Sequence, residues 1–178
     1  MSHRSMRMLI WQQKRIVAVN SPVISNTTPL IKLTGIGHLD LLPQLYSTIS
    51  IPEAVRLEYQ RGARPVDPDL DILPWIRVIK DVRLDPSLPK KLGAGEAEAI
   101  SLAISSQART LLLDERRGQQ VAAALGLPLG GTLGVLLGAK EEGLISAVGP
   151  AIDLMIAQGR HISLTLRAQV LRAAGEEP

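Results

Sequence analysis

The sequence PVISN at residues 22–26 and the sequence TLLLD at residues 110–114 are short apolar runs that each end in a polar residue. Continuous apolar runs of this length are typical of strands buried inside a parallel sheet. Around them the chain alternates between strand-like and helix-like segments, which indicates a parallel sheet with helices on its faces. Asn26 and Asp114 then lie at the carboxyl ends of two strands, where ligands bind in sheets of this class.

The alternating pattern predicts the elements along the chain. Strands are expected at residues 17–25, 47–51, 75–79, 110–113 and 127–129. Helices are expected at residues 28–33, 38–45, 52–61, 95–107, 115–125, 132–142, 147–157 and 164–174. Residues 62–92 are rich in proline and aspartate, so the strand at 75–79 is expected to be an edge element or part of a lid-like insertion.

Two glutamates lie inside the apolar stripes of predicted helices. At about 100° per residue, Glu96 projects among apolar residues of its helix, whereas Glu98 points the other way and is expected in solvent. The same test places Glu58 between Val55 and Tyr59. Carboxylates that face a core are costly unless they are paired, protonated or bound to a cation. Together with the two strand ends, these side chains predict a divalent-metal site.

Each of these residues also has a simpler interpretation. Asn26 and Asp114 stand where a strand meets a helix, so either side chain can cap the amides of the following helix. Glu58 can pair with a nearby arginine such as Arg61. Glu96 can favour the positive end of its helix. The positions of the two glutamates on apolar stripes favour the metal site over these alternatives.

The composition fits a single globular domain, with 178 residues of which 46% are hydrophobic and 21% charged. Cysteine is absent and the three histidines have no ligand spacing, which excludes a disulfide framework and argues against a zinc site. Aromatic residues make up only 2% of the chain, so a platform that stacks single-stranded bases is not expected. The sequence contains no serine-nucleophile, zinc-protease or dinucleotide motif.

The net charge of +3 is concentrated at the N-terminus. Residues 1–20 contain four basic residues and no acidic residue, which leaves 16 basic and 17 acidic residues in the rest of the chain. We therefore predict a basic N-terminal extension at residues 1–20 and a single domain at residues 21–178. The apolar runs are too short to span a membrane, and a cytoplasmic protein is expected.

Five stretches of the sequence carry a resemblance to a known family. They are VISNTTPLIKLTGIGHLDLL (23–42), IPEAVRLE (51–58), LGAGEAEAISLA (92–103), LLLDERRGQQVA (111–122) and GGTLGVLLGAKEEGLI (130–145). In this combination they resemble the PIN domain, and within it an uncharacterised branch related to VapC-type toxins. The resemblance covers roughly residues 22–165 and implies a three-layer α/β/α fold with a central parallel sheet.

The resemblance also implies a ribonuclease that depends on Mg²⁺ or Mn²⁺. Its metal ligands correspond to Asn26, Glu58, Glu96 and Asp114, of which the three carboxylates are the expected catalytic residues. Most such nucleases have Asp where this chain has Asn26, so weaker metal binding and catalysis are expected. A non-catalytic PIN-like module that binds nucleic acid or protein is the alternative, and it accounts directly for Asn26.

Residues beside these positions are candidates for contacts with RNA. Thr27 and Thr28 either bind a phosphate or start a helix, and Arg116 and Arg117 either contact the RNA backbone or lie free in solvent. The resemblance to VapC-type toxins implies an antitoxin-like protein that covers the acidic cleft. Two glycines in the helix at 132–142 allow close helix packing, either within the core or across a homodimer.

Overall fold

Five short strands form one sheet in which every neighbouring pair is parallel. The computed structural model describes residues 21–177 of the chain. The strands follow the order β3-β2-β1-β4-β5 across the sheet. Their bounds are β1 (Val23–Ser25), β2 (Ile49–Pro52), β3 (Ile76–Ile79), β4 (Thr110–Leu112) and β5 (Leu129–Gly130). The fold predicted from the sequence, a three-layer α/β/α domain around a parallel sheet, is confirmed.

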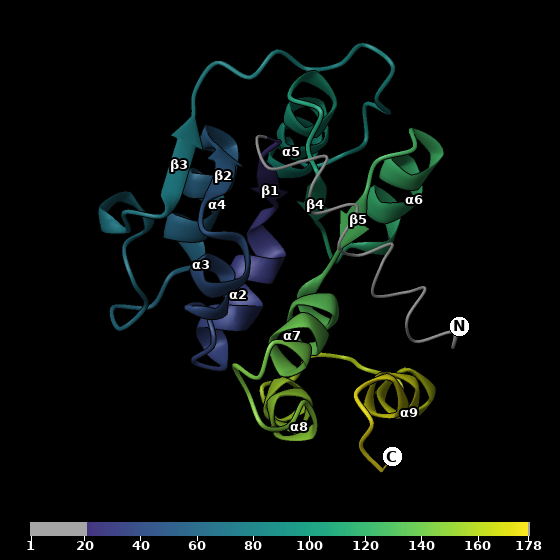
Figure 1. The fold of residues 1–178 in the computed structure, drawn as a ribbon. Coiled ribbons are helices and arrows are strands. Elements are labelled where there is room, and N and C mark those ends of the chain that lie inside the picture. The colour runs from purple at the N-terminus through teal and green to yellow at the C-terminus, as the bar shows by residue number, and fades with distance from the viewer. Residues whose placement is uncertain (1–20, 178) are drawn as a thin grey trace.

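Helices cover both faces of this sheet, and α8 and α9 lie beyond α7 at the end of the molecule away from α5 (Figure 1). Within the described residues, the α-helices are α2 (Thr27–Gly35), α3 (Leu41–Tyr46), α4 (Glu53–Gly62), α5 (Ala94–Ser105), α6 (Arg116–Ala124), α7 (Thr132–Glu141), α8 (Gly149–Ala157) and α9 (Leu164–Ala173). A short 3-10 helix, η1 (Leu70–Ile72), precedes β3. In residues 21–177 none of the helices has the length and apolarity needed to cross a membrane.

Side chains that alternate along the central strands divide the core into two clusters. Val23 and Leu112 pack with the cluster formed mainly by α2, α3, α4 and α7. Ile24 and Leu111 point to the opposite face and pack with α5 and α6. Each of these four side chains is at most 1% exposed, and burial of one such side chain contributes about 1.5–3 kcal/mol. The two apolar runs therefore serve both faces, as expected of strands at the centre of a parallel sheet.

Two details of the sequence prediction are resolved by the backbone. β3 lies at the edge of the sheet, so the edge alternative for residues 75–79 is confirmed. The helix expected to begin at His38 begins instead at Leu41, because Gly37 has a φ of 72° and the His38 amide closes the preceding helix by donating to Leu33 O at 2.8 Å. The predicted basic extension at residues 1–20 lies outside the described residues.

Glu176 joins the C-terminal segment to two helices. Its carboxylate accepts hydrogen bonds from Lys140 Nζ at 2.7 Å, Val148 N at 2.7 Å and Gly149 N at 2.9 Å. The last two amides stand at the start of α8, where backbone donors lack partners within the helix. Burial alone would raise the pKa of Glu176, but these hydrogen bonds and the Lys140 charge lower that pKa to about 2.

Replacement of Glu176 by Gln is expected to lower the free energy of unfolding by about 1–2 kcal/mol at pH 7, because it removes a charge-assisted acceptor. The pKa of Glu176 is lower in the folded protein than the ordinary value of 4.5, so its stabilisation is present above pH 4.5 and disappears as the pH falls towards 2. Urea titrations at several pH values measure this difference. Glu177→Gln, at an exposed neighbour, is the matched control, and an equal loss in both variants at pH 7 would contradict the assignment.

Candidate active site

The pairing of β1 with β4 brings two polar side chains together at the carboxyl edge of the sheet. Ser25 is in register with Leu112, and the backbone N–H of Asn26 donates to Leu112 O at 2.9 Å. The Asn26 side chain is 4% exposed, and its Nδ2 donates to Glu115 Oε2 at 3.1 Å. Thr28 Oγ1 donates to the other oxygen of Glu115. The sequence pattern does not select Glu115, the second polar residue after the strand. Its position next to Asp114 is the sequence feature that could have identified it.

The Glu115 carboxylate fixes the orientation of the Asn26 amide. Nδ2 faces the carboxylate, because the amide oxygen would be repelled there. Oδ1 therefore points the other way, where it is buried and has no hydrogen-bond partner among the described residues. A buried oxygen without a donor is costly, so this position favours a positively charged or hydrogen-bonding ligand.

Glu96 supplies a second buried oxygen without a partner. It lies in the first turn of α5, where Oε2 accepts a long hydrogen bond from Gly93 N at 3.4 Å and Oε1 accepts none from the described residues. Burial raises the pKa of Glu96, and the negative charge of Glu115 raises it further, whereas the backbone amides of Gly93 and Gly118 and the charge of Arg117 oppose these effects. A Cβ at Gly118 would collide with Glu96 Oε1, so a larger residue at this position would displace the Glu96 carboxylate.

Glu58 links three helices. Its Oε2 accepts from Thr27 Oγ1 at 2.6 Å, and its Oε1 accepts from Gly95 N at 2.9 Å. A Cβ at Gly95 would collide with the Glu58 carboxylate, so a glycine is needed for this close approach. Both oxygens of Glu58 are therefore engaged in holding the first turn of α5 against α2 and α4.

Asp114 is engaged by a different helix. Its Oδ1 accepts from Thr132 N at 2.8 Å, and its Oδ2 accepts from Thr132 Oγ1 at 2.7 Å and pairs with Lys32 Nζ at 2.8 Å. The side chain is only 9% exposed. Asp114 thus satisfies the first amide of α7, which is a capping role directed at a helix other than the one that follows it in sequence.

The expectation that Glu98 lies in solvent is wrong. Glu98 is partly buried, and its Oε2 accepts from Ala54 N at 3.2 Å. Ala54 lies in the first turn of α4, whose amides have no partners within the helix. Because α4 packs on α5, a carboxylate that points away from the apolar stripe still meets this helix end.

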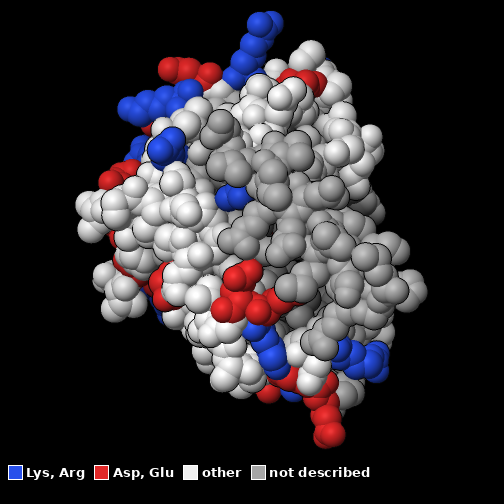
Figure 2. All heavy atoms as spheres, viewed as in Figure 1, with Lys and Arg blue, Asp and Glu red and all other residues white. Residues whose placement is uncertain are grey.

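The predicted RNA-contacting residues divide into two groups. The hydroxyls of Thr27 and Thr28 donate to Glu58 and Glu115, so both orient carboxylates in this structure. Arg116 and Arg117 are exposed on the first turn of α6, next to Glu115. Among the described residues on the face drawn in Figure 2, Lys and Arg side chains lie near Asp and Glu side chains.

A family model described as a PIN domain matches residues 22–176 of the sequence. The chain belongs to the PIN domain family. No curated protein and no solved structure matches the chain. PIN domains have a nuclease-type fold and generally use divalent metal ions. The closer relation to VapC-type toxins stays a prediction.

The donor atoms at the centre of this PIN domain suit a hard divalent cation. Asn26 Oδ1, Glu96 Oε1 and the Glu115 carboxylate are all oxygen donors, which Mg²⁺ and Mn²⁺ prefer. Two of these oxygens are buried without partners. Among residues 21–177, however, no three His, Cys, Asp or Glu side chains form a group that could hold a metal. These donor types suit a divalent cation, and the metal-ligand roles of Asn26, Glu58, Glu96 and Asp114 all stay predictions.

Glu115→Gln is expected to lower the pKa of Glu96, because it removes the negative charge that disfavours ionisation of Glu96. The titration of labelled carboxyl carbons by NMR measures this pKa directly. Glu141→Gln, an exposed substitution of the same charge change on α7, should leave the Glu96 titration unchanged. An unchanged Glu96 pKa in Glu115→Gln would show that the two carboxylates do not interact.

Proposed function

We propose that this PIN domain hydrolyses RNA phosphodiester bonds with the help of Mg²⁺ or Mn²⁺ held by Asn26, Glu96 and Glu115. The main support is that two buried oxygens, Asn26 Oδ1 and Glu96 Oε1, have no hydrogen-bond partner among the described residues. Glu115 hydrogen-bonds Asn26 and acts electrostatically on Glu96, so the three side chains form one interacting group.

The chain's own residues prepare this group. Thr28 and Asn26 Nδ2 together hold the Glu115 carboxylate in one orientation. Glu58 holds Gly95, and this contact positions the neighbouring Glu96 at the start of α5. A divalent cation at this site would stabilise the negative charge that develops on the phosphate as the bond breaks. Burial raises the pKa of Glu96, which favours the protonated form of this carboxyl group.

Glu58 and Asp114 have distinct places in this proposal. All four of their carboxylate oxygens accept hydrogen bonds or ion pairs from residues of the chain. We therefore propose that Glu58 holds α5 in position and that Asp114 holds α7 in position. To bind the ion directly, Glu58 would have to give up its contact with Thr27, and Asp114 its contact with Lys32. The Asp114→Asn variant tests whether Asp114 binds the ion.

RNA is the proposed substrate, and the proposed location is the cytoplasm. Thr27 and Thr28 would contact the substrate only if they left their carboxylate partners, so Arg116 and Arg117 are the better candidates for contacts with the RNA backbone. The proposal also includes binding of an antitoxin-like protein and formation of a homodimer.

One observation favours the alternative of a non-catalytic binding module. The Lys32 ammonium already neutralises Asp114, and Asn26 supplies no negative charge, so the site has fewer free acidic groups than the sequence pattern indicates. Such a module would bind RNA or protein through the same edge of the sheet without cleaving it.

Asn26→Asp is expected to lower the melting temperature without metal and to increase the stabilisation by Mn²⁺. The change replaces the hydrogen bond from Nδ2 to Glu115, now 3.1 Å long, by two facing carboxylates, at a cost of about 1–3 kcal/mol. A cation that binds between them restores this loss and adds binding energy. Thermal melting with and without Mn²⁺, together with cleavage of a mixed RNA pool, measures both effects. Gln169→Glu, which adds the same charge at an exposed site, is the control.

Three further results decide between the two functions. If the wild-type protein is stabilised by Mn²⁺ and cleaves RNA, the Glu115→Gln variant should show neither effect. Asp114→Asn should reduce cleavage strongly if Asp114 binds the ion, and should mainly reduce stability if it only holds α7. Binding of RNA without cleavage in the wild type and in Asn26→Asp would replace the nuclease by the binding module.

A further inference from the structure

A cavity of about 580 Å³ lies between α2, α7 and the segment that joins α8 to α9. Its volume falls within the roughly 300–1,000 Å³ of small-molecule sites. One end reaches Asp114, the residue that precedes Glu115 of the candidate active site. The lining residues are Lys32, Asp114, Gln119, Gly131, Thr132, Leu133, Gly134, Met155, Gly159, Arg160, His161, Ile162 and Leu166.

The polar part of the cavity has an excess of positive charge. Among the described residues that line it, Lys32 and Arg160 are permanently basic and Asp114 is the one carboxylate. Asp114 is already paired with Lys32 at 2.8 Å. Arg160 Nε is buried and has no hydrogen-bond partner in residues 21–177. A buried guanidinium donor without an acceptor favours an anion that supplies one.

The rest of the wall is apolar. Leu133, Met155, Ile162 and Leu166 come from three helices and the loop that joins the last two. This wall gives space and contact surface to an organic body attached to the anionic group. The cavity is also much larger than an inorganic ion needs, so a ligand with both an anionic head and a carbon skeleton fits its two surfaces best.

We propose that this cavity binds a phosphate monoester on an organic body, such as a nucleoside monophosphate or the phosphorylated end of an RNA strand. A tetrahedral phosphate offers oxygens in several directions, which matches basic groups on two separate parts of the chain. Lys32 lies on α2, whereas Arg160 and His161 lie in the loop before α9. The proposal requires no catalysis and no metal, so it stands independently of the proposed nuclease activity.

The test measures binding to the full chain in metal-free buffer by calorimetry and thermal melting. Adenosine 5′-monophosphate should bind and raise the melting temperature, whereas adenosine, which lacks the phosphate, should bind at least about tenfold more weakly. Inorganic phosphate should bind more weakly than the monophosphate, because it does not reach the apolar wall. Equal binding of adenosine and its monophosphate, or no binding of either phosphate ligand, would overturn the proposal.

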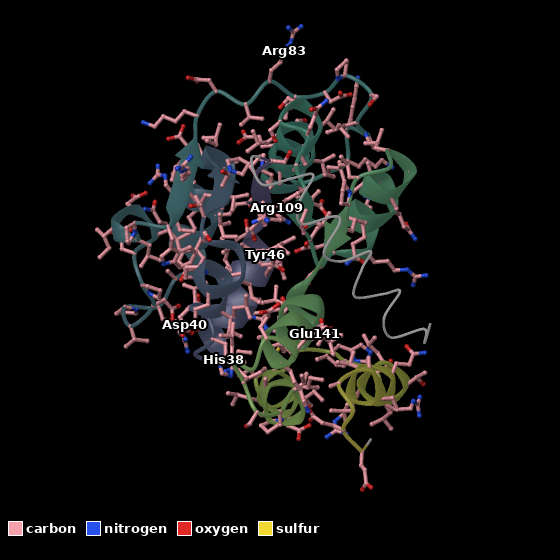
Figure 3. The ribbon with its side chains drawn as sticks, viewed as in Figure 1. His38, Asp40, Tyr46, Arg83, Arg109 and Glu141 are labelled. Atoms are coloured by element: carbon pink, nitrogen blue, oxygen red, sulfur yellow. The ribbon has the colours of Figure 1, made fainter. Side chains whose placement is uncertain are left out.

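Two variants locate the site. Arg160→Gln should weaken binding of adenosine 5′-monophosphate about tenfold or more, while Arg83→Gln, whose side chain projects into solvent far from α7 (Figure 3), should leave it unchanged. Gly134 lines the cavity and a Cβ there meets no atom within 4 Å, so Gly134→Leu adds apolar volume at the cavity wall. It should preserve folding, because glycine is a poor helix residue, and block the ligand. Unchanged binding in either of these cavity variants would contradict the assignment.

A pair of short oligoribonucleotides identifies the source of the phosphate. A preference of about tenfold for a 5′-phosphorylated oligomer over its 5′-hydroxyl counterpart assigns the cavity to a strand end. Binding of the free mononucleotide but of neither oligomer assigns it to a free nucleotide. Both results support a phosphate-monoester site.

Discussion

The parallel pairing of β1 with β4 is the constraint on which the candidate active site depends. It sets Ser25 beside Leu112, so that the residues after both strands leave the sheet at the same edge. Asn26 and Glu115 meet there although 89 positions separate them in the sequence. The strands themselves are held by burial on both faces, since Ile24 and Leu111 are fully buried. Packing of the apolar runs thus determines where the polar groups converge.

The carboxylates at this edge avoid mutual repulsion by acquiring separate partners. Lys32 and Thr132 engage Asp114, while Thr27 and the Gly95 amide engage Glu58. Within residues 21–177, this distribution leaves Asn26 Oδ1 and Glu96 Oε1 buried without a hydrogen-bond donor. The neutral amide of Asn26 also avoids repulsion, because it donates a hydrogen bond to Glu115, whereas a carboxylate at position 26 would repel the Glu115 carboxylate.

The sequence pattern was most informative where one local rule controlled the structure. Apolar runs and helix periodicity predicted the order and type of the strands and helices, and the prolines and aspartates around β3 indicated either the edge position that β3 has or a lid-like insertion. The same periodicity selected Glu96 as a partly buried carboxylate. It failed for Glu98, because the partner of that side chain is an amide of α4 and belongs to no pattern within α5.

The sequence by itself determined the α/β class, the PIN domain resemblance and the strand ends at which polar groups would gather, since these follow from residue order and short-range periodicity. Only the tertiary structure decided which atoms are satisfied. Lys32 reaches Asp114 from α2, and Glu115 replaces Asp114 as the neighbour of Asn26. Arg160 Nε has no acceptor among the described residues, and Arg160 lines a cavity formed by segments distant in sequence. Hydrogen bonds and charges act through space at a few ångströms, so their partners are fixed only when the helices have packed.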